Sequence, residues 1–366
     1  MVDPRESGVI VAASMRAEIV ILGGGVVGAS VAHHLAARGA DVLVLDRAAA
    51  PGGGSTARAT GGFRAQFDNE TEVRLSLLSR AKLLDFFEET GVDPGYRQHG
   101  YLFVACSEAE LERLRDAQRV QHACGVFEAR MVSAGEAREL NPAVEDETVL
   151  GGTFCPTDGF LRPMEVLRGY VEAATRNGAR FEYGVEHRGF VTEGDRVVAA
   201  RTSRGDVEAR IFVNALGAWS GPPVVPQRRN VAATVATNVL GEEMPMTIWS
   251  HDWYHLRVRD GRVLLLWPDE PLSEHWLMRV LRMTRDRVPC LRNVPVEEAW
   301  SGLYEMTPDG RALVGPSPVY ENVMLATGCS GHGVMHSPAI GQLVAELILD
   351  GRASLDVSAL SPARFS

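Results

Sequence analysis

The sequence predicts an α/β protein in which a nucleotide-binding domain with a parallel sheet is interleaved with a second domain built on an antiparallel sheet. Three observations support this fold class. Residues 18–46 have the pattern of a strand, a glycine-rich turn, a helix and a second strand. A strand at residues 322–326, a glycine-rich turn at 327–333 and an apolar helix at 338–349 return at the end of the chain. Between them, residues 253–267 carry the strongest hairpin signal, centred on Asp260-Gly261.

Composition and charge narrow the class of protein. Of the 366 residues, 45% are hydrophobic and 23% are charged, which is ordinary for a globular protein. The 37 basic and 47 acidic residues give a net charge of -10, which opposes binding to nucleic acid and to anionic lipid surfaces. Lys82 is the only lysine, so a mechanism that requires a catalytic lysine has one candidate.

Cysteine usage and the N-terminus indicate the compartment. The apolar run at residues 8–13 is too short for a membrane span and weak for a signal peptide, so we expect no membrane span and interpret residues 1–15 as a loose leader. The cysteines have no C-x-x-C pair and no metal-ligand spacing, which predicts reduced thiols, no metal site and a cytoplasmic location. They are Cys106, Cys124, Cys155, Cys290 and Cys329.

The first strand, turn and helix predict a dinucleotide site. The apolar strand at residues 18–22 leads into Gly23-x-Gly25-x-x-Gly28, and helical spacing follows. Gly23 permits the tight turn, Gly25 lets the backbone approach a pyrophosphate, and Gly28 lets the helix pack closely on the strand. The helix N-terminus supplies donors to the phosphates. A purely structural glycine turn is the alternative, which the flanking strand and helix disfavour.

Asp46 ends the second predicted strand, 21 residues after Gly25. An acidic side chain at this distance accepts hydrogen bonds from the ribose hydroxyls of a dinucleotide, and its charge disfavours the 2′-phosphate of NADP. An aspartate that caps the next turn is the alternative interpretation.

The remaining elements follow in order along the chain. Apolar residues at helical period predict one long amphipathic helix over residues 70–90, ended by Gly91. We interpret residues 100–150 as an insertion outside the nucleotide-binding domain, in which two helices follow serine caps. The predicted elements are a strand at 101–105, helices at 108–122, 134–140 and 162–177, and strands at 196–200 and 208–215.

The second glycine turn distinguishes FAD from NAD, which share the first unit. Residues 327–333 place this turn immediately before the C-terminal helix. An NAD enzyme needs no such turn, whereas a flavin enzyme holds the isoalloxazine ring against a distant helix whose N-terminus stabilises the anionic reduced flavin. The turn therefore predicts FAD, with a glycine loop before a surface helix as the alternative.

Five segments share the pattern of a known family, namely residues 23–30, 54–56, 214–219, 304–309 and 330–333. Together they resemble the D-amino acid oxidase superfamily of flavoproteins, and most closely the group of sarcosine oxidase, glycine oxidase and the proline dehydrogenase beta subunit. The resemblance spans nearly the whole chain. It implies a Rossmann-like FAD-binding domain with an interleaved antiparallel-sheet (α+β) substrate domain, and we expect these domains at 16–95, 151–220 and 305–366, and at 96–150 and 221–304, respectively.

The resemblance also implies which residues contact FAD. The loop after the second strand would cross the flavin, where Gly53 and its small neighbours allow close approach of the backbone. The expected contacts are Gly23, Gly25, Val26, Val27, Gly28, Asp46, Arg47, Gly54, Ser55, Thr56, Thr60, Gly61, Gly62, Val185, Ala215, Gly217, Trp219, Gly302, Gly331, His332, Gly333, Val334 and Met335.

Four residues are implied as catalytic. Arg64 matches an arginine that binds the substrate carboxylate, a task that suits a bidentate guanidinium. Tyr304 would line the cavity over the flavin, and His332 would donate to the ring. Tyr254 would belong to an aromatic wall on the predicted hairpin. Each residue also has a structural alternative. Arg64 could form a surface salt bridge and His332 could bond only to backbone. Tyr304 and Tyr254 could be packed or core side chains without a catalytic role. The other aromatic residues near this hairpin are Trp249, Trp253 and His255.

Departures from the family motifs predict that FAD is not covalently bound. Gly302 stands where monomeric sarcosine oxidases have the cysteine that tethers FAD, and Arg58 stands where other relatives have a histidine. Pro163 stands at the place of a histidine that holds a second, covalent FMN in heterotetrameric relatives. We therefore expect dissociable FAD and no FMN.

Missing lysines form a second departure. The oxygen-activating lysine of sarcosine oxidases would fall within residues 263–265, and a carboxylate-binding lysine would fall at Met335. Without a cation beside the flavin, developing superoxide loses stabilisation. The sequence therefore favours a dehydrogenase, which passes electrons to an acceptor or a partner subunit, over an oxidase.

These features together predict FAD-dependent oxidation of a small amine or amino acid of the sarcosine, proline or glycine kind. Hydride would pass to flavin N5 and the imine product would hydrolyse, with the protein acting mainly by positioning. Because only the neutral amine donates hydride, the rate should rise with pH. The alternatives are an FAD-containing assembly or electron-transfer subunit without its own turnover, and an NAD-linked dehydrogenase.

Overall fold

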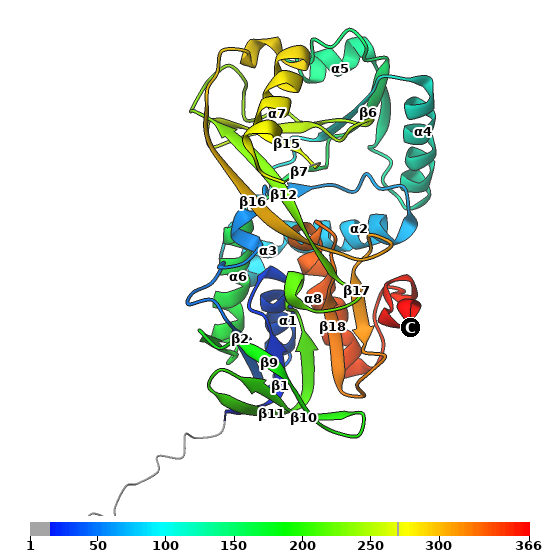
Figure 1. The fold of residues 1–366 in the computed structure, drawn as a ribbon. Helices are drawn as coiled ribbons and strands as arrows, with labels where there is room; N and C mark the ends of the chain where they lie inside the picture. The colour runs from blue at the N-terminus through cyan, green and yellow to red at the C-terminus, as the bar shows by residue number, and fades with distance from the viewer. Residues whose placement is uncertain (1–14, 269–270) are drawn as a thin grey trace, which may run out of the picture.

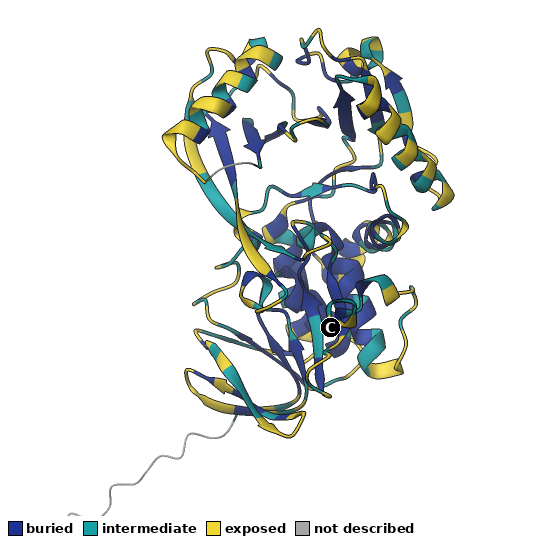
Figure 2. Ribbon diagram, turned by 45° about the vertical axis from the view of Figure 1, so that its right-hand side comes forward, coloured by how far each residue is buried: buried dark blue, intermediate teal, exposed yellow. Residues whose placement is uncertain are grey.

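The computed structural model describes residues 15–268 and 271–366, so the predicted leader, residues 1–15, lies outside the described residues except at its last position. Two large sheets organise the chain, one in each half of the molecule (Figure 1). Buried residues concentrate around the helices and strands of the half that carries the C-terminus (Figure 2).

One sheet is of the parallel type predicted for the start of the chain. Its strands are β1 (Arg16–Leu22), β2 (Val42–Asp46), β8 (Arg180–Tyr183), β9 (His187–Glu193), β10 (Arg196–Thr202), β11 (Gly205–Asn214), β17 (Leu313–Pro316) and β18 (Val323–Thr327). The order is β17-β18-β11-β1-β2-β8, with β10 and β9 added to β11 in antiparallel fashion. β1 pairs in parallel with both β2 and β11, so segments far apart in the sequence lie side by side in the middle of the sheet.

Helices pack on one face of this sheet. The helices of the described residues are α1 (Val26–Ala36), α2 (Glu70–Leu84), α3 (Phe86–Thr90), α4 (Glu108–Ala123), α5 (Ala134–Leu140), α6 (Pro163–Arg176), α7 (Glu274–Arg287) and α8 (Gly333–Asp350), with 3-10 turns η1 (Thr56–Arg58), η2 (Gly217–Trp219), η3 (Pro289–Leu291), η4 (Ser358–Leu360) and η5 (Pro362–Phe365). Ile19 and Ile21 of β1 pack with α1 and α8, whereas Val20 and Leu22 pack on the opposite face. Burial on both faces explains the continuous apolar run of this strand.

Two predicted helices have different limits in the structure. The prediction of a single helix over residues 70–90 is wrong, because the helix is interrupted at Asp85. The φ of -91° and ψ of 0° at this residue lie outside the helical region and separate α2 from α3. The C-terminal helix begins at Gly333 rather than at the predicted residue 338. Pro338 lies inside it and donates no hydrogen bond to the Val334 carbonyl, which accepts instead from Ser337 Oγ at 3.0 Å.

The second sheet is mostly antiparallel. Its strands are β4 (Tyr101–Ala105), β5 (Arg130–Ser133), β6 (Gly151–Cys155), β12 (Val225–Thr234), β13 (Met246–Trp249), β14 (His255–Arg259), β15 (Arg262–Trp267) and β16 (Val296–Met306). The order is β16-β12-β15-β14-β13-β4-β6-β5. The predicted hairpin is confirmed as β14–β15, and both turn residues, Asp260 and Gly261, have positive φ as a type I′ turn requires.

Two features of this half were not predicted. β6 pairs with β4 and β5, so residues 151–155, which we expected in the FAD-binding domain, belong to the second sheet. α7 covers the sheet and is capped by Ser273, whose side chain accepts from the Trp276 N–H. A further pair of short strands, β3 (Gly62–Phe63) and β7 (Gly159–Phe160), joins the two halves.

The two faces of the second sheet have different neighbours. Leu256 and Val258 point from β14 into an apolar core with Trp276 of α7. Their neighbour Arg257 points the other way, where its Nη1 donates to the Thr60 carbonyl at 2.7 Å. This second face therefore lies against the half that contains α1 and α8. Within the described ranges, no helix is long and apolar enough to cross a membrane.

Candidate active site

Two helix N-termini that face one cavity have no side-chain cap. The N-cap residue of α1 is Gly25, which has no side chain, and that of α8 is His332, whose side chain does not bond the first turn of its helix. The Val26 N–H of α1 reaches only Thr56 Oγ1, at 3.2 Å. Bare N–H groups and the positive end of the helix dipole form a site for anionic groups. Four of the other described helices, α2, α4, α5 and α7, have a side-chain cap, provided by Asn69, Ser107, Ser133 and Ser273, whereas α3 and α6 also lack one.

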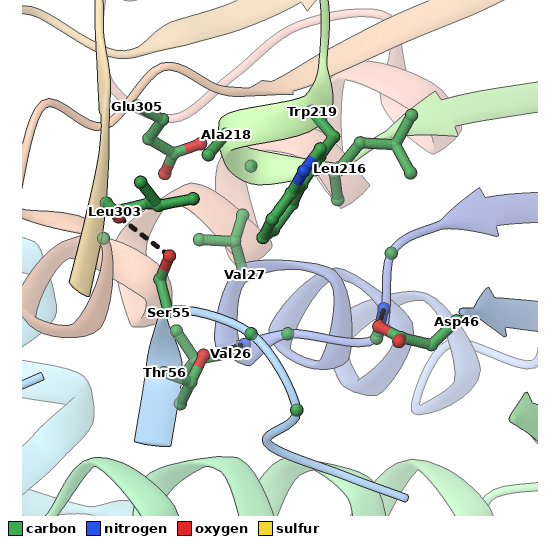
Figure 3. Close-up of a pocket in the computed structure, with 18 of the residues that line it drawn as sticks. Val26, Val27, Asp46, Ser55, Thr56, Leu216, Ala218, Trp219, Leu303 and Glu305 are labelled. Atoms are coloured by element: carbon green, nitrogen blue, oxygen red, sulfur yellow. Dashed lines mark hydrogen bonds between the residues drawn. The ribbon is translucent and has the colours of Figure 1, made fainter. Parts of the chain in front are cut away.

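The cavity has a volume of about 330 Å³ and extends between these two helix ends (Figure 3). Tyr304 and Glu305 of β16 also line it. The structure brings together 17 of the residues expected to contact FAD: Gly23, Gly25, Val26, Val27, Asp46, Arg47, Gly54, Ser55, Thr56, Val185, Ala215, Gly217, Trp219, Gly302, Gly331, Gly333 and Val334.

The glycines of the first turn have two different roles: two of them allow close packing of the backbone, and one leaves the backbone open to the cavity. A Cβ at Gly23 would lie 2.3 Å from the Ala215 carbonyl oxygen, and one at Gly28 would lie 1.9 Å from the Gly23 carbonyl oxygen. These two glycines therefore let α1 approach β1 and β11. At Gly25 a Cβ would meet only Thr56 Oγ1, at 3.5 Å. This position leaves the backbone open to the cavity, as close approach of a pyrophosphate requires.

Asp46 and Arg47 mark the end of the cavity beside β2. The Asp46 carboxylate accepts from the Gly24 N–H at 2.7 Å and from the Ala48 N–H at 2.7 Å. These bonds fix the carboxylate at the end of its strand, beside the glycine turn (Figure 3). The Arg47 guanidinium lies 3.7 Å from the ring centre of Trp219, whose side chain points toward Val27 across the cavity (Figure 3).

Glu305 lines the cavity near α8 and was not among the residues predicted from the sequence. Its Oε2 accepts from Thr327 Oγ1 at 2.9 Å and from the Gly328 N–H at 3.1 Å. Burial raises the pKa of this carboxyl group above its usual range. The signal that could have identified Glu305 is an acidic side chain next to Tyr304 in a segment shared with the family.

Six residues expected to contact FAD lie behind the wall of the cavity in the described structure. Thr60 and Gly61 accept from Arg257 through their carbonyls, and a Cβ at Gly62 would lie 1.9 Å from the Tyr101 hydroxyl oxygen. This segment therefore contacts the second sheet. The others are Gly28, His332 and Met335, of which Gly28 packs on Gly23 and Met335 belongs to the core with α1.

Arg64 follows β3 and lies beside α8. Its guanidinium stacks on Phe67, 3.6 Å from the ring centre, donates to the Gln66 carbonyl, and lies 3.4 Å from His332 Nε2. Burial lowers the pKa of Arg64, an effect that the nearby acids Asp158, Glu72 and Asp68 oppose. Among the described residues no carboxylate lies within ion-pair distance of this arginine. A half-buried guanidinium without an ion pair is suited to an incoming carboxylate.

Tyr304 lies above the second glycine turn. A Cβ at Gly331 would lie 2.2 Å from its ring, so the ring packs directly on this turn. The Arg229 guanidinium lies 5.5 Å from the ring centre of Tyr304. Burial raises the pKa of the Tyr304 hydroxyl, so the side chain stays neutral at ordinary pH. Tyr304 thus joins the cavity wall near α8 to the second sheet.

Tyr254 does not line the cavity. Its side chain is fully buried in the core with Trp249, and its hydroxyl bonds Thr284 Oγ1 of α7 at 2.8 Å. The predicted catalytic role of Tyr254 therefore conflicts with its place on the core face. His255 points to the opposite face, where burial and the charge of Arg64 lower the pKa of its ring to about 4. The sequence contained a signal for the core position of Tyr254. Side chains two residues apart in a strand share a face, and Leu256, two residues after Tyr254, is apolar.

The uncapped helix ends, the open glycine backbone and the strand-end carboxylate define a dinucleotide-binding protein, and these groups fit FAD. The chain belongs to the family described as FAD dependent oxidoreductase (DAO), whose model matches residues 18–347. FAD is the cofactor of this family, as predicted from the two glycine turns.

Individual relatives agree with this family. "FAD-dependent oxidoreductase domain-containing protein 1" of Xenopus laevis is 29% identical over 96% of this chain and 83% of its own length. Human mitochondrial dimethylglycine dehydrogenase is 26% identical over 96% of this chain, which spans only 44% of that relative.

Solved structures show the same fold. The crystal structure of L-proline dehydrogenase from P. horikoshii has a TM-score of 0.89 and 29% sequence identity, over 96% of this chain and 98% of that one. Glycine oxidase from Geobacillus kaustophilus has a TM-score of 0.84 and 25% identity, over 95% and 98%. The α/β fold predicted from the sequence is thereby confirmed.

Proposed function

We propose that this protein is a dehydrogenase that oxidises a small amine or amino acid of the sarcosine, proline or glycine kind with non-covalently bound FAD. FAD supplies the hydride acceptor. The single observation that carries the proposal is Arg64, a half-buried guanidinium that forms no ion pair among the described residues and lies beside Tyr304 and the second glycine turn. Three of the relatives named above, dimethylglycine dehydrogenase, L-proline dehydrogenase and glycine oxidase, are named for substrates of this size.

The chain's own residues would position both molecules. The α1 N-terminus and Gly25 would hold the pyrophosphate, Asp46 the ribose, and the α8 N-terminus the polar edge of the ring. Arg64 would bind the substrate carboxylate in bidentate fashion, and Tyr304 would close the cavity above the ring. Gly302 offers no side chain for a covalent bond to FAD.

Two features support a dehydrogenase over an oxidase. The only lysine, Lys82, pairs with Glu89 at 3.1 Å on α2 and α3, away from the cavity wall. Residues 263–265, where the oxygen-activating lysine of sarcosine oxidases would fall, are buried apolar residues of β15. Electrons would then leave through an acceptor or a partner subunit. The cysteines, all unpaired in the described structure, agree with the proposed cytoplasmic location.

Anaerobic reduction of the bound flavin tests this function. Purified protein should be yellow, and its visible band should bleach when sarcosine, proline or glycine is added without oxygen. Replacement of Arg64 by Ala should raise the half-saturating substrate concentration about 10- to 100-fold, because a charged hydrogen-bond pair contributes about 1.5–3 kcal/mol.

The matched control is Arg74→Ala, which removes an exposed arginine paired with Glu70 on α2 and should leave the half-saturating concentration unchanged. An unchanged value for Arg64→Ala would remove Arg64 from the carboxylate site. Bound flavin that no amine of the panel bleaches would favour a subunit for assembly or electron transfer instead.

A further inference from the structure

A group of buried and half-buried polar side chains extends from Arg64 away from the FAD cavity. His332 Nδ1 lies 3.6 Å from Glu72 Oε2, and His336 Nδ1 lies 3.5 Å from the same oxygen. His336 Nε2 bonds Ser76 Oγ at 2.9 Å. Glu72 and Ser76 come from α2, whereas His336 comes from α8. Glu72 is 4% exposed, and both Glu72 Oε2 and His332 Nδ1 are buried without a hydrogen-bond partner in the described structure.

The contact with Arg64 determines which ring nitrogen of His332 carries the hydrogen. A guanidinium only donates, so His332 Nε2, 3.4 Å from Arg64 Nη2, must be the acceptor of this contact. A neutral imidazole with a lone pair on Nε2 carries its hydrogen on Nδ1. The Nδ1–H of His332 therefore faces Glu72 Oε2, and a proton path leads from the Arg64 side of the ring to the carboxylate. Such bonds are often long in a free enzyme and shorten when substrate binds.

The charges around Glu72 favour a proton acceptor near neutral pH. Burial raises the pKa of Glu72 to about 7, whereas burial and Arg64 lower the pKa values of His332 and His336, so both rings are neutral. Charged groups from several elements act on Glu72. Arg64 and Arg311 lower its pKa, whereas Asp309 and Asp68 raise it. Glu72 in turn raises the pKa of the Cys329 thiol.

We propose that Glu72, acting through His332, accepts the proton that the substrate ammonium group loses before hydride transfer. This inference rests on the proposed function, since it assigns the proton of that reaction. The substrate N–H bond breaks as His332 Nε2 takes the proton, and the Nδ1 proton passes to Glu72 Oε2. The products are a neutral amine, a neutral carboxylic acid and a neutral His332 of the other tautomer, with no other reactant required.

Substrate binding itself would drive this transfer. Arg64 lowers the pKa of Glu72 in the free protein. A carboxylate bound to Arg64 cancels that charge and draws the guanidinium from His332 Nε2, which both raises the proton affinity of Glu72 and frees the ring nitrogen. The carboxylate end of the substrate would thus prepare the protein to deprotonate its amine end.

Proton uptake on binding tests the inference without turnover. Methoxyacetate and tetrahydrofuran-2-carboxylate carry oxygen in place of the amine of sarcosine and proline, so they offer a carboxylate but no amine proton. On binding to the FAD-loaded protein in weak buffer just above pH 7, each should cause uptake of up to one proton per site, measured with an indicator dye. Binding itself is followed by the shift of the flavin band.

Glu72→Gln should abolish this uptake while the flavin band still shifts. The control is Glu70→Gln, which removes an exposed acid of α2 that pairs with Arg74 and is not among the charges acting on Glu72, so the uptake should stay as in the wild type. Uptake that persists in Glu72→Gln, or binding without uptake in the wild type, would overturn the inference but not the proposed function. Failure of both probes to bind would overturn the carboxylate site at Arg64, and the inference with it.

The pH profile of flavin reduction provides the second readout. Glu72→Gln should reduce the limiting rate about 10-fold or more near pH 7, because general-base assistance is lost, and the rate should recover at alkaline pH where the amine loses its proton unaided. Glu72→Asp should restore part of the neutral rate, and His332→Gln should behave as Glu72→Gln. A loss of equal size at every pH would show a purely structural role and would overturn the proposal.

Discussion

The FAD cavity and the buried group of Arg64, Glu72, His332 and His336 lie side by side but are built in opposite ways. The cavity is mainly backbone, formed by glycine turns and by two helix ends without caps. The neighbouring group is made of charged and titratable side chains from α2, α8 and the segment after β3. A backbone site is sensitive to added atoms and indifferent to pH, whereas a side-chain site responds to pH and to single charges.

The largest effect that distinguishes the two regions is expected at Gly28. In Gly28→Ala the new Cβ would lie 1.9 Å from the Gly23 carbonyl oxygen, so α1 must move away from its strand. Such overpacking costs about 1–3 kcal/mol, and we expect FAD affinity to fall roughly 10-fold or more. Flavin absorbance retained after dialysis measures the loss.

Gly135→Ala provides the matched control for Gly28. Gly135 lies in α5, where the nearest atom to an added Cβ is Ser133 Oγ at 3.9 Å. Because alanine favours helix, we expect full FAD content and unchanged or slightly higher stability. A Gly28→Ala protein that retains FAD as firmly as this control would contradict the role assigned to the glycine turn.

The second effect is a pH dependence of stability specific to the charged group. Glu72 has a pKa of about 7 in the folded protein against 4.5 unfolded, so the folded state binds more protons between these values. Its stabilising contribution is complete below pH 4.5 and is lost as pH rises through 7. Glu72→Gln stays neutral, so its free energy of unfolding relative to wild type should rise by up to about 3 kcal/mol across this window.

Urea unfolding of FAD-free protein at the two ends of the window measures this difference. Asp158, a second buried carboxyl with a pKa raised to about 6, follows the same trend in both proteins and cancels in the comparison. A constant difference between Glu72→Gln and wild type would mean that Glu72 does not titrate in this range.

The smallest expected effects are those of two tyrosine-to-phenylalanine variants, which compare the core of the second sheet with the cavity wall. Tyr254→Phe removes the bond to Thr284 and should lower the free energy of unfolding by about 1 kcal/mol, with no change in substrate binding. Tyr304→Phe should instead change substrate binding and leave stability nearly unaltered. Denaturation curves and flavin titrations of both variants check this pair, and a binding defect in Tyr254→Phe would reverse the assignment of the faces.

The elements of the nucleotide-binding half were the most predictable. The unit from β1 to β2 and the turn before α8 are local patterns in which glycine position, apolar run and charge agree, and most of the residues expected around FAD do line the cavity. The predicted continuous helix over residues 70–90 failed because the sequence pattern continues through Asp85 although the backbone does not. The domain limits and the catalytic roles of Arg64 and Tyr304 stay predictions.

The sequence by itself determined that the chain binds a dinucleotide, because the groups that do so are backbone atoms whose exposure depends on nearby glycines. Only the tertiary structure decided which side chains meet around Arg64. Tyr254 and His255 are adjacent in sequence, yet alternation along a strand sends one to the core and the other toward Arg64. Likewise, the pairing of Glu72 with His332 depends on two helices that are 260 residues apart and is visible only when they pack.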